Sequence, residues 1–328
     1  MENQAEQLNN EGVSFFLKGD FNKAEEIYWK ALEVDPNYAA TLNNLGMLSL
    51  QKKEYKEAEK LFRKALNIKN NGTYFLNLGH ALANQNKLDD AEEMYTKSIE
   101  LIPDSLMSWK SLGSLYQYSK QFHNSIEIWK KIISDMDSGP FFKIQLAKDI
   151  IELKEYEEAL EILYSISRQE NYKDEIWYHI GLIHFFQKNF GLSKEAINNC
   201  LVCNPNYLKG RSLLATIHLA LMNYKSALTE WEYILNKDPD NSNVRMDKAV
   251  TLISLNRNEE AIKDINYILE EKPENYKALF YKAMALIELK SKKDAIKILE
   301  ELIESETPFR IKAENVLIKL KQLNNEYN

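Results

Sequence analysis

The chain has 328 residues, of which 45% are hydrophobic and 28% charged, with 42 Lys and Arg against 49 Asp and Glu. This composition favours a folded protein over a disordered one, and the net charge of −7 disfavours nucleic acid as a partner, because binding phosphates requires positive charge. The first ten residues lack the apolar stretch of a signal peptide, no apolar run is long enough to cross a bilayer, and two cysteines suit a reducing compartment. We therefore expect a cytoplasmic protein that does not insert into membranes.

A small residue recurs along the chain at a spacing of 33 or 34 residues. We number each repeat so that this residue stands at position 8. A repeat of this length cannot bury its apolar side alone, so consecutive repeats must stack to form a continuous core. The residues at position 8 are Gly12, Gly46, Gly79, Gly113, Ala147, Gly181, Ala215, Ala249 and Ala283.

Each repeat is predicted to form two helices that pack against each other. In the first helix, apolar residues at positions 4, 7 and 11, such as Trp109, Leu112 and Tyr116, share one face. In the second helix a small residue at position 20 is followed by a large apolar residue at position 24, as in Ala58 and Phe62. Alternating small and large residues allow two antiparallel helices to approach closely and interlock.

This pattern resembles the tetratricopeptide repeat family over residues 5–308, with residues 1–4 as a short lead-in. The resemblance implies an all-α fold, a right-handed α-solenoid (superhelix) of nine tandem repeats in one continuous domain. Helical geometry leaves positions 2, 5, 6, 9, 12 and 13 of the first helices to line the inner curve. Proteins of this family usually bind their partners in that concave groove.

Asparagines occupy inner positions in the first three repeats. A primary amide can both donate to and accept from the backbone of an extended peptide, so a ladder of asparagines can hold a peptide without reading its sequence. This is similar to the asparagine ladder in the repeat arm of O-GlcNAc transferase. The alternative is that asparagine merely tolerates a solvated groove wall. The residues are Asn9, Asn10, Asn43, Asn44 and Asn77.

Farther along the chain, the inner positions become more apolar. Lys110 lies at an inner position of the fourth repeat, and aromatic or aliphatic residues follow in the later repeats. Exposed apolar surface of this kind usually marks a partner site, although some of these side chains will pack between neighbouring repeats. An amphipathic helix or an extended apolar segment would fit this surface. The residues that we assign to it are Tyr178, Phe185, Phe186, Met246, Phe280 and Tyr281.

Two short segments have more than one interpretation. Ser138, Gly139 and Pro140 form a break signal, and a tight turn is favoured over a hinge because the repeat spacing is kept across it. Cys200 and Cys203 could be a redox pair or half of a zinc site, with His184 and His218 as the remaining ligands. Cys200 stands at position 27, where other repeats have a small packing residue, so we expect no metal and no cofactor.

Residues 309–328 are predicted to form a C-terminal capping helix. The segment from Phe309 to Leu323 is amphipathic, and a polar outer side is what the end of a repeat array requires for solubility. Its apolar residues are Ile311, Val316, Leu317, Leu320 and Leu323, and its polar residues are Lys312, Glu314, Lys319 and Lys321.

No glycine-rich phosphate loop, serine elbow or zinc-protease histidine pair is present in the sequence. We therefore expect a non-enzymatic scaffold or adaptor, or an assembly co-chaperone, that binds a protein or peptide partner and no small-molecule substrate. The alternative is a regulatory or substrate-recruiting subunit of an enzyme encoded separately, for example a glycosyltransferase. The fold alone does not separate these functions.

Overall fold

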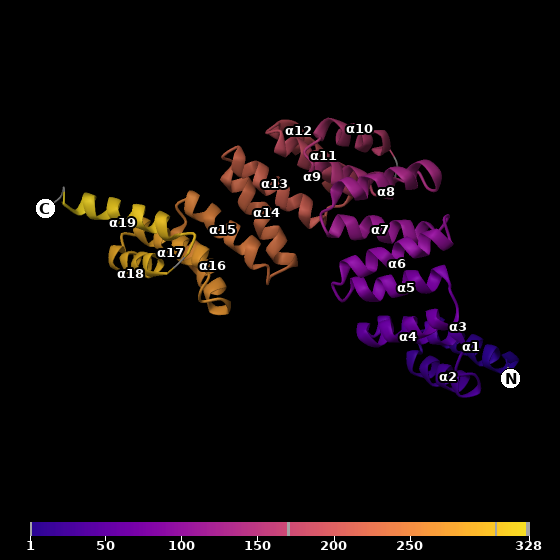
Figure 1. The fold of residues 1–328 in the computed structure, drawn as a ribbon. Helices are drawn as coiled ribbons and strands as arrows, with labels where there is room; N and C mark the ends of the chain where they lie inside the picture. Colours follow the sequence, from indigo (N-terminus) through magenta and orange to yellow (C-terminus); the bar gives the residue numbers. More distant parts are fainter. Residues whose placement is uncertain (1, 169–170, 306, 326–328) are drawn as a thin grey trace. The chain divides into compact units, whose positions relative to one another are not determined.

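The computed structural model describes residues 2–168, 171–305 and 307–325. Within these residues the chain forms nineteen α-helices and no strand (Figure 1). The helices follow one another as pairs, each pair corresponding to one predicted repeat, and α19 follows the last pair. The expected all-α architecture is confirmed.

The chain divides into two compact parts, Met1–Ile166 and Ser167–Asn328. The helices of the N-terminal part are α1 (Glu2–Leu17), α2 (Phe21–Val34), α3 (Ala39–Gln51), α4 (Tyr55–Ile68), α5 (Gly72–Ala83), α6 (Leu88–Leu101), α7 (Leu106–Tyr118), α8 (Phe122–Asp135), α9 (Pro140–Glu152) and α10 (Tyr156–Ile166). Those of the C-terminal part are α11 (Lys173–Phe186), α12 (Phe190–Cys203), α13 (Leu208–Ala220), α14 (Tyr224–Lys237), α15 (Ser242–Ser254), α16 (Asn258–Glu271), α17 (Tyr276–Glu288), α18 (Lys292–Glu304) and α19 (Arg310–Asn325).

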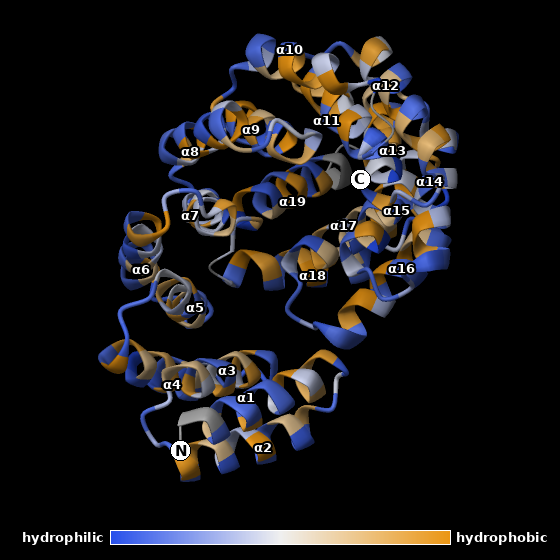
Figure 2. Ribbon diagram, turned by 90° about the vertical axis from the view of Figure 1, so that its right-hand side faces the viewer, coloured by the Kyte–Doolittle hydropathy of each residue, from blue (hydrophilic) through white to orange (hydrophobic). Residues whose placement is uncertain are grey.

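The two helices of a repeat approach closely because of the small residue at position 8. A Cβ atom added to Gly46 would lie 2.5 Å from Cε1 of Phe62, the large residue at position 24 of the same repeat. Added to Gly79, it would lie 2.5 Å from Cε1 of Tyr95. The apolar sides of the helices are thereby buried, and Figure 2 shows hydrophobic and hydrophilic residues interspersed along each helix, as an amphipathic pattern requires.

The turn between the two helices of a repeat always contains one residue in the left-handed conformation, at position 15. In the second repeat the Lys53 N–H donates to the Leu50 carbonyl at 2.9 Å, and the Glu54 N–H donates to the Ser49 carbonyl at 2.8 Å. Only the first repeat places glycine at position 15. The residues are Gly19, Lys53, Asn86, Lys120, Lys154, Lys188, Met222, Asn256 and Lys290.

The segment Ser138–Pro140 connects α8 to α9 within the N-terminal part. Gly139 caps the N-terminus of α9, and Pro140 is the first residue of that helix. Helices α8 and α9 pack against each other, with the rings of Trp129 and Phe142 6.3 Å apart. The division between the two parts lies later in the chain, between the fifth and sixth repeats.

Helix α19 packs against α18, the second helix of the last repeat. Ala313, Leu317 and Leu320 are buried together with Leu299 and Leu302. Ile311, one of the apolar residues of this segment, is exposed. At 3.6 residues per turn it lies about 160° around the helix from Ala313. The side chain of Leu323 lies outside the described residues, and the capping role of residues 309–328 stays a prediction.

No helix in the described part of the chain is both long and apolar enough to cross a membrane.

Candidate functional site

The first helices of the repeats carry all twelve predicted binding residues, and in each part we call the side that they form the first-helix face. In the N-terminal part it consists of α1, α3, α5, α7 and α9, and in the C-terminal part of α11, α13, α15 and α17. Several of these first helices contact the next one directly, as α1 and α3 or α11 and α13 do. Each part has its own first-helix face.

The asparagines of the N-terminal section bind one another between repeats. Asn44 Nδ2 donates to Asn9 Oδ1 at 2.8 Å, and Asn77 Nδ2 donates to Asn43 Oδ1 at 2.9 Å. Thr41 Oγ1 also donates to Asn9 Oδ1, at 3.0 Å. The amides therefore link α1 to α3 and α3 to α5.

These internal bonds limit what the asparagines can offer a peptide. Asn9, Asn43 and Asn77 are buried, whereas Asn44 is half-buried and Asn10 is exposed. The two donors to Asn9 Oδ1 occupy both of its lone pairs. Sequence spacing predicted that these asparagines lie on first helices, but it did not reveal that their amides bond to one another.

Lys110 lies beside a trough of about 370 Å³ on the first-helix face between α5 and α7. Leu88 and Tyr95 of α6 and Leu115 of α7 supply apolar lining, while His80 and Ser111 stand on the two facing first helices. The Lys110 ammonium lies 4.6 Å from the centroid of the Phe141 ring. Of these trough residues, only Lys110 was predicted from the sequence.

The trough has a hydrogen-bonded polar pair in its lining and large exposed side chains near its ends. A hydrogen bond of 3.0 Å joins His80 Nε2 and Ser111 Oγ, and burial lowers the pKa of His80, which favours the neutral imidazole. Met107 and Tyr118, which also line the trough, are 55% and 70% exposed. Their positions, 2 and 13, were both predicted to lie on the inner side.

In the C-terminal part, most of the predicted apolar residues pack against other rings. The rings of Tyr178 and Tyr207 are 5.4 Å apart, those of Phe185 and Phe190 5.7 Å apart, and those of Phe280 and Phe309 5.4 Å apart. Tyr178, Phe185, Phe280 and Tyr281 are half-buried, Phe186 is exposed, and Met246 is buried in a core cluster with Ala249 and Leu252. The continuous exposed surface is therefore smaller than the sequence pattern suggests.

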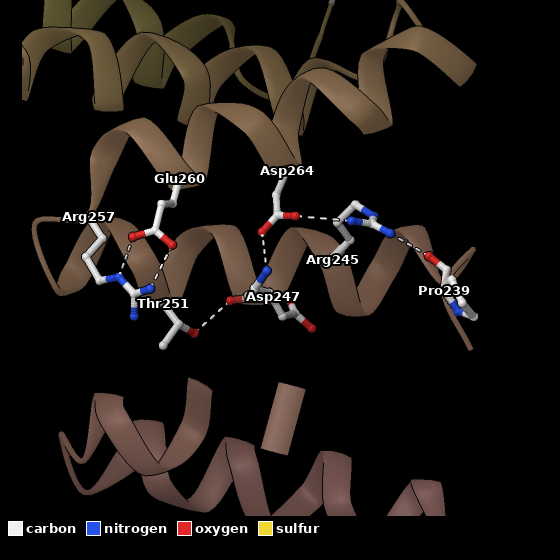
Figure 3. A network of polar contacts seen from close by, with 8 residues as sticks. Pro239, Arg245, Asp247, Thr251, Arg257, Glu260 and Asp264 are labelled. Carbon is white, nitrogen blue, oxygen red and sulfur yellow. Dashed lines mark hydrogen bonds and ion pairs between the residues drawn. The ribbon is translucent and has the colours of Figure 1, made fainter. Parts of the chain in front are cut away.

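A polar network fixes the first helix of the eighth repeat to its neighbours (Figure 3). Arg245 donates to Asp264 Oδ1 at 3.1 Å and to the carbonyl oxygen of Pro239 at 2.6 Å. Its guanidinium lies 4.0 Å from the centroid of the Tyr267 ring, and Lys248 lies 2.9 Å from Asp264 Oδ2. Arg245 thus joins its own repeat to the proline that ends the preceding one.

The seventh repeat uses the same arrangement. Arg211 donates to Glu230 Oε2 at 2.7 Å and to the Pro205 carbonyl at 2.9 Å, and its guanidinium lies 3.5 Å from the Tyr233 ring centroid. Position 4 was expected to be apolar, so sequence reasoning missed both arginines. The detectable signal is an arginine at position 4 with an acidic residue at position 23 and a tyrosine at position 26 of the same repeat.

The two cysteines of the Cys-x-x-Cys pair differ in exposure and environment. Cys200 is buried and Cys203 is exposed, and burial raises the pKa of the Cys200 thiol to about 12, which leaves it protonated and unreactive at neutral pH. Within the described residues, no group of three or more His, Cys, Asp or Glu side chains is placed to hold a metal ion.

The comparisons with known proteins agree on one kind of repeat. Models of the tetratricopeptide repeat match residues 3–71, 39–104 and 174–207, and the model of the N-terminal TPR repeats region of Psidin matches residues 217–320. The match at 174–207 coincides with the sixth repeat as the spacing defines it.

One similar curated protein is "DnaJ homolog subfamily C member 7 homolog" of Dictyostelium discoideum. The two proteins are 24% identical over an alignment of 182 residues, and the alignment covers 51% of this chain and 32% of that protein. The chain therefore spans about a third of the length of this curated relative.

Two solved structures illustrate the shared fold. The APC/C hetero-tetramer Cut9–Hcn1 gives a TM-score of 0.56 at 17% identity, covering 85% of this chain and 55% of that chain. The C-terminal part of a TPR repeat-containing protein from Cytophaga hutchinsonii gives a TM-score of 0.59 at 17% identity, covering 72% and 97%. At such identities the likeness concerns the fold alone.

Proposed function

The chain belongs to the tetratricopeptide repeat family, and from that premise we propose that it is a non-enzymatic scaffold that binds a segment of a partner protein on its first-helix face. The fold is typical of protein–protein interaction scaffolds, and the matched models describe repeats of this fold rather than an enzyme family. We propose that the N-terminal part binds this segment of the partner as an extended peptide.

The observation that carries this proposal is the trough between α5 and α7. It opens on the first-helix face, it has an apolar floor, and two large side chains, Met107 and Tyr118, are exposed beside it. Large exposed apolar groups next to a pocket are characteristic of interaction sites. Asn10 and Asn44, which keep exposed surface, would contact the same peptide farther toward the N-terminus.

The C-terminal part has side chains that would form a second contact with the partner. Phe186 is exposed, and the half-buried Phe280 and Tyr281 lie at inner positions of α17. These groups would suit the apolar side of an amphipathic helix. The likeness to the DnaJ relative over 51% of this chain favours an assembly co-chaperone as the particular kind of scaffold.

Affinity capture followed by lysine crosslinking tests the binding face. The full chain would be used to capture partners from extract of its own cells, and the crosslinked lysines would be identified by mass spectrometry. We expect crosslinks at Lys110, Lys209 and Lys277 of the first helices, with Lys60 and Lys97 of the second helices as the internal control. Crosslinks confined to the second helices would refute the proposed face.

The same capture separates the scaffold from its rival. Several clients bound at less than one copy per chain would support a scaffold or co-chaperone. A single enzyme recovered at one copy per chain would instead indicate a regulatory or substrate-recruiting subunit.

A further inference from the structure

We propose that the trough between α5 and α7 selects an extended segment of the partner in which a leucine or phenylalanine is flanked by aspartate or glutamate. This inference rests on the proposed function, because it names the partner chemistry at that same face. It differs from the expectation for the asparagines, which would hold a backbone of any sequence.

The trough has the length of a short extended segment. Met107 and Tyr118 both line it, and they stand eleven residues apart near the two ends of α7. A helix rises 1.5 Å per residue, so they are separated by about 16 Å along its axis. An extended chain advances about 3.3 Å per residue, and the trough therefore accommodates about five residues.

The floor of the trough is suited to a large apolar side chain. Tyr95 and Leu115 are buried beneath it, and Leu88 is half-buried at its side. Met107 adds a flexible thioether that adapts to different apolar shapes, and Tyr118 adds an aromatic ring that buries a large area at little entropic cost. A leucine or phenylalanine of the segment would contact this apolar floor.

The charge of the trough favours carboxylates beside that side chain. Lys110 is the one side chain of the Lys, Arg, Asp and Glu types in the lining, and burial lowers the pKa of His80, which favours its neutral form. Among the described residues Lys110 forms no ion pair, and its ammonium lies over the Phe141 ring. An acidic partner residue would provide the missing counter-charge, whereas a basic one would be repelled.

Hydrogen-bonding groups remain for the partner backbone. Asn84 Nδ2 donates to the His80 carbonyl at 2.9 Å, which leaves Asn84 Oδ1 to accept a backbone N–H. The exposed Ser114 hydroxyl can donate or accept. By contrast, Asn9, Asn43 and Asn77 are buried, and they use their amides to link repeats.

Fluorescence anisotropy with three labelled peptides tests the selection. The acidic probe is fluorescein-Gly-Asp-Leu-Asp-Leu-Asp-Gly-amide; the second probe has lysine in place of each aspartate, and the third has alanine in place of each leucine. With the full chain at physiological salt, we expect the acidic probe to bind at least tenfold more tightly than either of the others. Lys110→Glu should abolish or reverse the preference for aspartate, and Tyr118→Ser should weaken the acidic probe at least fivefold.

Lys209→Glu is the matched control, because Lys209 is an exposed lysine of the first-helix face in the C-terminal part. This change should leave the affinity of the acidic probe within twofold of wild type. If the probe binds but Lys110→Glu has no more effect than Lys209→Glu, the trough assignment is wrong and the proposed function stands. If no probe binds while a captured partner still crosslinks to the first helices, the proposed selection of acidic and apolar residues is wrong and the proposed function stands. If that partner crosslinks only to second helices, both proposals fail.

Discussion

At the scale of single residues, the tryptophans at position 24 require an acceptor in the following repeat. Trp129 Nε1 donates to Asp149 Oδ2 at 2.8 Å, and Trp231 Nε1 donates to Thr251 Oγ1 at 3.2 Å. Asp149 and Thr251 both stand at position 10. After Leu163, which has no N–H group in its side chain, the corresponding residue is the apolar Ile183. A buried donor without an acceptor costs free energy, which explains the pairing.

Trp129→Phe and Trp231→Phe form a matched pair that measures this requirement. Asp149 is 1% exposed, and it accepts bonds from Trp129, Gln117 and Ser125. Trp129→Phe removes a donor from this buried carboxylate, so we expect it to lower the free energy of unfolding by about 2 kcal/mol. Trp231→Phe removes a bond to a neutral hydroxyl and should cost about 1 kcal/mol. Urea unfolding of the two variants would measure both values, and equal losses would contradict the argument.

Asp149 should also make stability depend on pH. Burial raises its pKa above the ordinary value of 3.8 despite its three donors. The folded state therefore binds this proton at a higher pH than the unfolded state does, so the cost of the ionised carboxylate is present at neutral pH and is relieved as the pH falls through the folded pKa. Relative to Asp149→Asn, which cannot ionise, the wild type should gain stability as the pH is lowered from neutral through the raised pKa of Asp149. A constant difference between the two proteins over this range would show that Asp149 does not titrate there.

At the scale of helices, α19 packs against the last repeat with one face only. Leu317 is buried against the cluster of Leu299 and Leu302, while the adjacent Ile318 is 54% exposed. The apolar face of α19 is therefore narrower than its sequence suggests, since Ile311 and Ile318 lie on its outer side.

Leu317→Asp and Ile318→Asp separate the two faces of α19. Aspartate at 317 would place a charge in the core and should destabilise α17–α19 by about 3 kcal/mol. Aspartate at 318 meets solvent, and its effect should stay within about 0.5 kcal/mol. Hydrogen exchange would locate the loss of protection in Leu317→Asp. If α17 and α18 kept full protection in that variant, the predicted capping role of α19 would be wrong.

At the scale of the whole molecule, the repeat spacing predicted the helix pairs because one physical requirement recurs in every repeat. The small residue at position 8 and the large residue at position 24, such as Gly46 and Phe62, must interlock wherever two helices cross. A single sequence repeats this solution nine times, so the all-α class and the helix order followed from it.

The candidate site was predictable only in part, because it depends on contacts between different repeats. Spacing placed Lys110 at an inner position, but the trough also needs Tyr95 from a second helix and His80 from the preceding repeat. The amide bonds between Asn9 and Asn44 likewise depend on side-chain conformations that no spacing specifies. Arg245 was missed because its charge is satisfied by Asp264, a partner nineteen residues away.

The division of the chain at Ile166 and Ser167 leads to a prediction about its modularity. The N-terminal part contains a buried cluster with Phe62 and Tyr95, and the C-terminal part contains clusters built around Trp231 and Leu299. In a repeat protein, stability comes mainly from each repeat and its immediate neighbours. Residues 1–166 and 167–328, expressed separately, should therefore each fold into helical proteins with cooperative thermal unfolding.

Circular dichroism and hydrogen exchange on the two fragments would test this, with the intact chain as the control. Exchange protection of α3–α6 in the first fragment and of α13–α18 in the second should match that of the intact chain. The two fragments end differently. The second ends with α19, which follows its last repeat, whereas the first ends at α10 without a further helix. Any loss of protection in the first fragment should accordingly begin at α9 and α10, because end repeats lack one neighbour. Loss that begins at α1, or an unfolded second fragment, would show that stability is not local.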